Sequence, residues 1–140
     1  MKRRKSWADK MRSPKPHQIK PAPMDIAGMR KGEIMLIPTA RMIDDFIRAM
    51  PRGTSMDARG MRAALARQHS AEAACPITTG ILLRIVAEAA FEASEAGAKP
   101  KEITPVWRVL DPASPTLKKL SYDPAFILTR RAAEGLDRPN

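Results

Sequence analysis

The chain has 140 residues, enough for one domain with a modest core and too few for two independent domains with ordinary linkers. Its 25 Lys and Arg outnumber its 15 Asp and Glu, so the net charge is +10 and the expected partner is a polyanion. No apolar stretch reaches the ~18 residues of a membrane span. The single cysteine, Cys75, excludes an internal disulfide and a cysteine-ligated zinc site. We therefore expect a cytoplasmic protein, nucleoid-associated if bacterial, without cofactor or metal.

The N-terminal segment, residues 1–32, is the most basic part of the chain. It holds ten Lys and Arg against Asp9 and Asp25, which is +8 of the net charge, and four prolines. Such a composition buries too little apolar surface to offset the entropy of ordering it. The segment is predicted to be an extended basic arm that binds polyanions non-specifically, with a solubilising tail as the alternative.

The predicted domain covers residues 33–136 and begins with a short apolar run. Residues 33–38 end in a proline and favour a brief strand. Residues 39–50 have apolar side chains at helical spacing, and Thr39 can cap this helix. A second helix is expected over residues 55–69.

The third and longest helix is predicted to begin with Thr78 or Thr79 as its cap and to end at Gly97, a residue that tolerates positive φ. Its apolar residues recur at helical spacing. The stripe expected to face the core consists of Ile81, Leu82, Ile85, Val86, Ala89 and Ala90.

After this helix, residues 103–110 are rich in β-formers and predict a strand or wing. Asp123 as a cap and Pro124 at the first helical position mark a last helix, with apolar residues 126–128 inside and Gly135 at its end. The order of elements predicts a mainly α, winged-helix or helix-turn-helix-like domain, followed by a short tail over residues 137–140.

Four short sequences support a more specific interpretation. Met50-Pro-Arg-Gly53 precedes a short helix, Pro76-Ile-Thr-Thr-Gly80 opens the long helix, and Pro105-Val-Trp-Arg-Val109 and Arg131-Ala-Ala-Glu-Gly-Leu136 follow. Over residues 38–136 this order resembles the DNA-binding domain of the alkylguanine-DNA alkyltransferases and their alkyltransferase-like relatives. The resemblance implies a winged-helix fold and a duplex DNA partner.

The resemblance also implies that the chain does not transfer alkyl groups. The family's Pro-Cys-His-Arg-Val signature has Val106 at the acceptor cysteine and Trp107 at the histidine, and a valine cannot form a thiolate. The alkyltransferase-like branch, which recognises damaged bases, lacks the cysteine too. Ala58 stands near the family's tyrosine, and residues 77–79 hold no arginine finger, so base flipping is not implied.

Three groups of residues form the candidate site. Thr78, Thr79 and Arg84 lie near the start of the third helix, where backbone N–H groups and hydroxyls suit phosphates. The structural alternative is a pair of helix caps beside a solvated arginine. Flanking phosphate contacts are predicted at Arg52, Arg59, Arg62, Arg108, Lys118 and Lys119, and a pocket for a modified base at Pro105, Val106 and Trp107.

The sequence therefore predicts a non-catalytic protein that binds double-stranded DNA and, by resemblance, recognises modified or distorted bases. No spacing typical of a catalytic triad, a carboxylate pair or a metal site is found. One alternative is a divergent alkyltransferase that uses Cys75, because a helix N-terminus favours a thiolate. The other is an RNA- or protein-binding adaptor that acts through residues 1–32.

Overall fold

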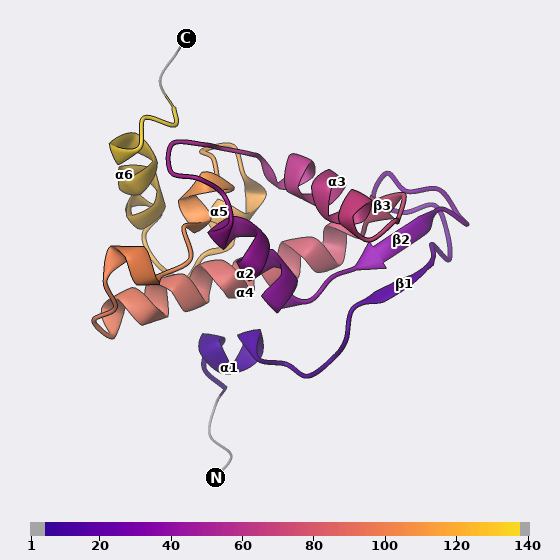
Figure 1. The fold of residues 1–140 in the computed structure, drawn as a ribbon, viewed down its shortest axis with the longest axis horizontal. Coiled ribbons are helices and arrows are strands. Elements are labelled where there is room, and N and C mark those ends of the chain that lie inside the picture. The colour runs from indigo at the N-terminus through magenta and orange to yellow at the C-terminus, as the bar shows by residue number, and fades with distance from the viewer. Residues whose placement is uncertain (1–4, 138–140) are drawn as a thin grey trace.

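Helices make up most of the regular structure, and a small sheet lies at one end of the molecule (Figure 1). The computed structural model describes residues 5–137. The helices are α1 (Trp7–Met11), α2 (Ala40–Arg48), α3 (Ala58–Gln68), α4 (Pro76–Glu95), α5 (Pro115–Lys119) and α6 (Ala125–Ala133). The strands are β1 (Gln18–Pro21), β2 (Ile34–Ile37) and β3 (Ala73–Ala74), and two 3-10 turns are η1 (Pro100–Glu102) and η2 (Val106–Arg108). The predicted mainly helical chain with a short β element is confirmed.

Helices α2 and α3 form where their caps and spacing predict them. The Thr39 hydroxyl accepts a hydrogen bond from the Met42 N–H at 3.1 Å, and the Asp57 carboxylate accepts one from the Gly60 N–H at 2.7 Å. Each bond satisfies an N–H that the first turn leaves without a partner. Buried side chains of both helices, such as Ile43 and Ile47, belong to the main core.

Helix α4 crosses the centre of the molecule, and its start differs from the prediction. It begins at Pro76, whose fixed φ suits the first helical position, so Thr78 and Thr79 lie inside the first turn and are not caps. Its buried face agrees with the predicted stripe at Val86 and Ala90 and differs at Ile81, which is 59% exposed. Leu83 and Ala87, outside the predicted stripe, are also buried.

The sheet has the order β1-β2-β3. Strand β2 forms within the predicted apolar run and pairs antiparallel with β1 and parallel with the short β3. Strand β3 belongs to the connection between α3 and α4, so the sheet fixes where α4 begins. The Cys75 N–H, directly before α4, donates a hydrogen bond to the Leu36 carbonyl of β2 at 2.9 Å and so ties the start of the helix to the sheet.

Residues 5–32, the described part of the predicted extended arm, contain a helix and a strand; residues 1–4 of that prediction lie outside the described residues. Helix α1 packs against α4, and the Glu92 carboxylate accepts hydrogen bonds from the N–H groups of Trp7 and Ala8, both at 3.2 Å. Strand β1 gains its hydrogen bonds from β2, a partner that local composition does not reveal. Of the apolar side chains in this segment, Trp7 is half-buried, whereas Ile19 and Met24 are exposed.

The strand or wing predicted over residues 103–110 is absent. The run contains turn η2 instead, with a hydrogen bond from the Val109 N–H to the Val106 carbonyl at 3.0 Å. This turn places Val106, Val109 and Leu110 in the core together. Their i, i+3, i+4 spacing is helical, and it outweighs the β-propensity of the valines.

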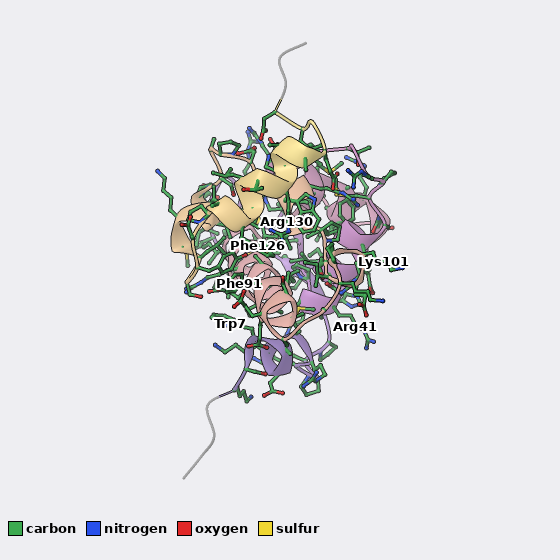
Figure 2. All side chains as sticks on the ribbon, turned by 90° about the vertical axis from the view of Figure 1, so that its left-hand side faces the viewer. Trp7, Arg41, Phe91, Lys101, Phe126 and Arg130 are labelled. Atoms are coloured by element: carbon green, nitrogen blue, oxygen red, sulfur yellow. The ribbon has the colours of Figure 1, made fainter. Side chains whose placement is uncertain are left out.

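Helix α6 begins at Ala125, next to the Asp123 carboxylate, which accepts the Ala125 N–H at 2.8 Å. Its Phe126 packs edge-on against Phe91 and Tyr122, and the Arg130 guanidinium lies 3.7 Å from the Phe126 ring centroid (Figure 2). These aromatic contacts join α6 to α4. The predicted burial is right for Ile127 and wrong for Leu128, which is 36% exposed. Within residues 5–137, none of the helices is long and apolar enough to cross a membrane.

Candidate nucleic-acid interface

A groove of about 720 Å³ runs along the N-terminal half of α4. Segments far apart in the sequence form its other walls, namely α1, the start of α3 and the start of α5. Figure 1 shows α1 lying beside α4 on one side of the molecule. We call this feature the α4 groove. The residues used below are Trp7, Lys10, Arg62, Ile77, Thr79, Ile81, Arg84, Ser114, Thr116 and Lys119.

The α4 groove is strongly basic. Lys10, Arg62, Arg84 and Lys119 line it, and its lining contains no Asp or Glu. Within the described part of the chain, only Arg84 of these four forms an ion pair, with Glu88 at 3.7 Å. Four cationic groups around one concave surface give a positive potential that concentrates anions.

Helix α1 contributes both an aromatic and a cationic side chain to this groove. The Lys10 ammonium lies 4.0 Å from the Trp7 ring centroid, and the Arg84 guanidinium carbon lies 5.4 Å from it. Both distances fit cation–π contacts. Figure 2 shows Trp7 between the ribbons of α1 and α4. The Trp7 ring therefore links the two basic side chains across the groove.

Buried polar atoms without a hydrogen-bond partner gather in the same place. Among residues 5–137, three such atoms occur, Thr79 Oγ1, Arg84 Nε and Ser114 Oγ, and all three residues line the α4 groove. The Thr79 and Ser114 residues are 1% and 8% exposed. An unsatisfied buried polar group costs about 1–3 kcal/mol. Such a cluster suits a polar occupant that accepts hydrogen bonds.

Two isoleucines on α4 add exposed apolar surface beside these polar groups. Ile77 and Ile81 are 51% and 59% exposed, and both line the groove. Their four-residue spacing places them one above the other on the same face of the helix. This face of α4 therefore offers apolar and cationic contacts together.

The structure brings only some of the predicted contact residues together. Thr79, Arg84, Arg62 and Lys119 line the α4 groove. Among the remaining predicted residues, Thr78 is half-exposed and outside its lining, and the exposed side chains of Arg52, Arg59 and Lys118 also lie outside it.

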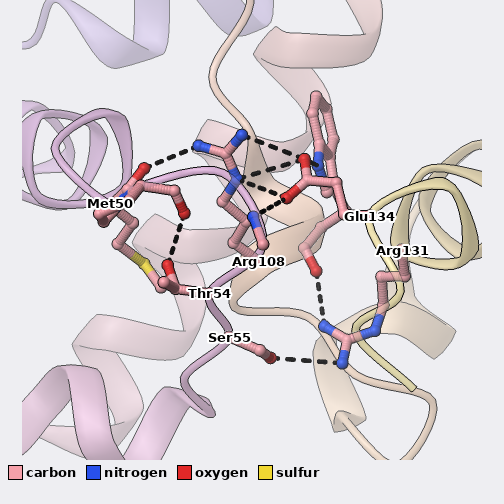
Figure 3. A network of polar contacts seen from close by, with 9 residues as sticks. Met50, Thr54, Ser55, Arg108, Arg131 and Glu134 are labelled. Carbon is pink, nitrogen blue, oxygen red and sulfur yellow. Dashed lines mark hydrogen bonds and ion pairs between the residues drawn. The ribbon is translucent and has the colours of Figure 1, made fainter. Parts of the chain in front are cut away.

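Arg108 belongs to a structural network instead, with Glu134 at its centre (Figure 3). Arg108 donates through Nε and Nη2 to the Glu134 carboxylate, both at 3.0 Å, and through Nη1 to the Met50 carbonyl at 2.7 Å. The same carboxylate accepts the Trp107 Nε1–H at 2.6 Å and the Gly53 N–H at 2.8 Å. A 3-10 turn replaces the predicted strand here, and Trp107 and Arg108 therefore both reach the Glu134 carboxylate.

Arg131 supports the same region from α6. It is 3% exposed, and its guanidinium donates to the Trp107 carbonyl at 2.6 Å, to Asp137 at 2.7 Å and to Ser55 at 3.3 Å. The hydrogen bond from Arg131 lowers the pKa of Asp137. Arg108 and Arg131 therefore connect the loop between α2 and α3 to the C-terminal end of the chain by hydrogen bonds.

The predicted base pocket at residues 105–107 is small. Val106 is completely buried in the main core, and Pro105 and Trp107 line a hollow of about 260 Å³ with Arg48 and Arg108 among its other residues. Sites for small molecules usually measure about 300–1,000 Å³. In this conformation the hollow is below that range.

Cys75, the candidate nucleophile of the alternative enzyme, is 9% exposed. It packs with Ala22, Met29 and Met35 in a small cluster beneath the N-terminal segment. The residue precedes α4 as expected, and the chain that covers it separates its thiol from solvent. Its surroundings are those of a structural cysteine.

Six of the ten groove residues named above were not predicted as contacts, namely Trp7, Lys10, Ile77, Ile81, Ser114 and Thr116. Trp7 and Lys10 belong to residues 1–32, which were predicted to be an extended arm. The docking of α1 on α4 depends on a long-range contact with Glu92, which no local pattern reveals. Ser114 carried a weak signal, since a serine before Pro115 is a typical N-cap, yet its hydroxyl makes no capping hydrogen bond.

Comparisons of this chain with models of protein families, with curated proteins and with solved structures give no match.

Proposed function

We propose that this protein binds double-stranded DNA without catalysis and that the α4 groove is the contact surface. The observation that supports this most is the groove lining, which combines four basic side chains with no acidic one. DNA exposes closely spaced phosphates, and cationic side chains that neutralise them provide most of the non-specific affinity. The cations come from α1, α3, α4 and α5, so four elements far apart in the sequence contribute charge to one surface.

The form of α4 favours a duplex over a single strand. An α-helix fits the major groove of B-DNA, which is about 12 Å wide. The N-terminal part of α4 presents Ile77 and Ile81, whose exposed side chains suit contact with thymine methyl groups, while basic groups surround them. We assign the exposed N-terminal face of α4, at Ile77 and Ile81, the role of contacting the duplex in a helix-turn-helix-like arrangement, with α3 and β3 before it. The resemblance to the alkyltransferase-like family supports the same assignment.

The N-terminal segment acts with this surface rather than apart from it. Lys10 lines the groove, and β1 is hydrogen-bonded to β2. Under the adaptor alternative, residues 1–32 would bind alone and the domain would only support them. The position of Lys10 favours one joint surface.

The first prediction tests the contact surface by charge removal. The double variant Arg62→Gln, Lys119→Gln should bind a mixed-sequence duplex about tenfold more weakly at physiological salt, because two phosphate contacts are lost. The slope of log affinity against log salt concentration should fall by about 2. Fluorescence anisotropy at several salt concentrations measures both quantities.

The matched control is Arg59→Gln, Lys118→Gln, which changes the net charge equally on the same two helices outside the groove lining. This variant should retain most of the affinity and the slope. An equal loss in both double variants would mean that binding follows total charge, and it would contradict the α4 groove as the contact surface.

A further inference from the structure

Besides its basic rim, the α4 groove has a set of buried hydrogen-bond donors. Thr79 Oγ1, Ser114 Oγ and Arg84 Nε lack partners among the described residues. We propose that these three groups form a binding site for a single phosphate group of the DNA backbone. This inference rests on the proposed function and adds to it the atoms that hold one phosphate.

The two hydroxyls are buried more deeply than helix caps or surface contacts require. Thr79 is 1% exposed although it lies in the first turn of a helix, and Ser114 is 8% exposed although it precedes α5 and caps nothing. Both residues line the groove. A hydroxyl donates one hydrogen bond, and the oxygens of a phosphate can accept several at once.

Arg84 supplies the third hydrogen-bond donor for a phosphate. Its Nη2 faces the Glu88 carboxylate at 3.7 Å, and this carboxylate is held by hydrogen bonds from the Ser121 N–H and hydroxyl at 3.0 and 2.6 Å. Glu88 is buried, and its contact with Nη2 leaves the Nε–H without a partner. The Nε–H can therefore donate to a ligand, and Lys10 and Lys119 supply the net positive charge of the groove beside this ion pair.

The N-terminal end of α4 also favours the binding of a phosphate. Ile77 and Thr79 belong to the first turn of a 20-residue helix, and the N-terminal end of such a helix has a partial positive charge. Pro76 has no N–H, so the free backbone donors of this turn begin at Ile77. Two buried hydroxyls, the Arg84 guanidinium and a positive helix end together suit an oxyanion with several acceptor oxygens.

The test uses the full chain and inorganic phosphate as the probe. Titration followed by amide NMR should shift the resonances of Thr79 and Ser114, and acetate at equal ionic strength should shift them far less. Thr79→Val and Ser114→Ala should each abolish the phosphate response. Thr79→Ser should retain it, because serine keeps the hydroxyl while removing only a methyl group. Thr78→Val, a neighbour outside the groove lining, is the matched control.

The same variants are then compared in duplex binding. Thr79→Val and Ser114→Ala should each weaken the affinity about tenfold, as expected for the loss of a hydrogen bond to a charged group, and Thr78→Val should leave it unchanged. Blunt duplexes with and without a 5′-phosphate distinguish a backbone phosphodiester from a terminal phosphate. If the site holds a backbone phosphodiester, each substitution should weaken binding to both duplexes equally.

Unchanged duplex affinity in Thr79→Val and Ser114→Ala, while Arg62→Gln, Lys119→Gln still binds weakly, would overturn this inference and leave the proposed function standing. A phosphate response without any effect on duplex binding would assign the site to free phosphate, also against the inference. An equal acetate response would contradict phosphate specificity. If no variant affects duplex binding, the proposed function fails with it.

Discussion

Glu134 shows how one carboxylate organises several distant backbone segments. It is nearly buried, with a side chain 4% exposed, and it receives hydrogen bonds from Arg108, Trp107 and the Gly53 N–H. Partial desolvation alone would raise its pKa, but the hydrogen bonds from Arg108, Gly53 and Trp107 and the charge of Arg108 lower the pKa to about 2. The ionised form is therefore strongly preferred in the folded state.

Replacing this residue should lower the stability of the fold. Glu134→Gln leaves the Arg108 guanidinium without its counter-charge, and we expect the free energy of unfolding at pH 7 to fall by about 3 kcal/mol. Urea unfolding followed by far-UV circular dichroism measures the change. Glu95→Gln, at an exposed position on α4, serves as the surface control and should have little effect.

The same contact predicts a direction for the pH dependence. Because the folded pKa of Glu134, about 2, lies below its ordinary value of 4.5, the contribution to stability is complete above about pH 4.5 and is lost as the pH falls toward 2. The difference between the wild type and Glu134→Gln should therefore shrink over that range. A constant difference from pH 7 to pH 2.5 would contradict this account of the network.

At the scale of single elements, α1 packs closely against α4, and one carboxylate of α4 holds the start of α1. The Glu92 carboxylate accepts both N–H groups at the start of α1, and Trp7 packs beside it. A carboxylate at a helix N-terminus satisfies free donors and opposes the positive helix end. Glu92→Ala should remove this support.

We expect hydrogen exchange of the α1 amides to become about tenfold faster in Glu92→Ala, since a hydrogen bond to a charged group contributes about 1.5–3 kcal/mol. Amides in the middle of α4 should keep their protection. Glu95→Ala, three residues further along the same helix, is the control. Unchanged exchange in α1 would mean that Trp7 packing alone holds the helix.

How well the elements could be predicted depended on where their stabilising partners lie. Helices α2 and α3 have their caps and apolar spacing in their own sequence, and both were found. The buried face of α4 was predicted only in part, with Val86 and Ala90 right and Ile81 wrong. This helix is apolar over most of its surface, so its contacts with α1, α2 and α5 decide which side is covered. Strand β1 was missed for a similar reason, since β2 supplies its hydrogen bonds.

At the scale of the whole molecule, the sequence identified part of the candidate site. Thr79 and Arg84 were predicted because a helix start suits contact with phosphate. Arg62 and Lys119 were predicted from their charge alone. Lys10 and Ser114 join them only because folding brings residues about a hundred positions apart to one groove. Such an arrangement depends on tertiary contacts, and a local pattern contains no information about them.

The last prediction concerns what the whole molecule recognises. The resemblance of residues 105–109 to the alkyltransferase-like signature predicts a preference for a duplex that contains an alkylated guanine. Val106 is buried and the Trp107 indole is hydrogen-bonded to Glu134, so a base can enter there only if these side chains move. We expect the full chain to prefer the modified duplex about tenfold at physiological salt, about 1.4 kcal/mol, with a change in tryptophan fluorescence that the unmodified duplex does not cause. Equal affinities would leave DNA binding by the α4 groove as a general, lesion-independent function, because that groove lies apart from residues 105–107 and depends on none of them.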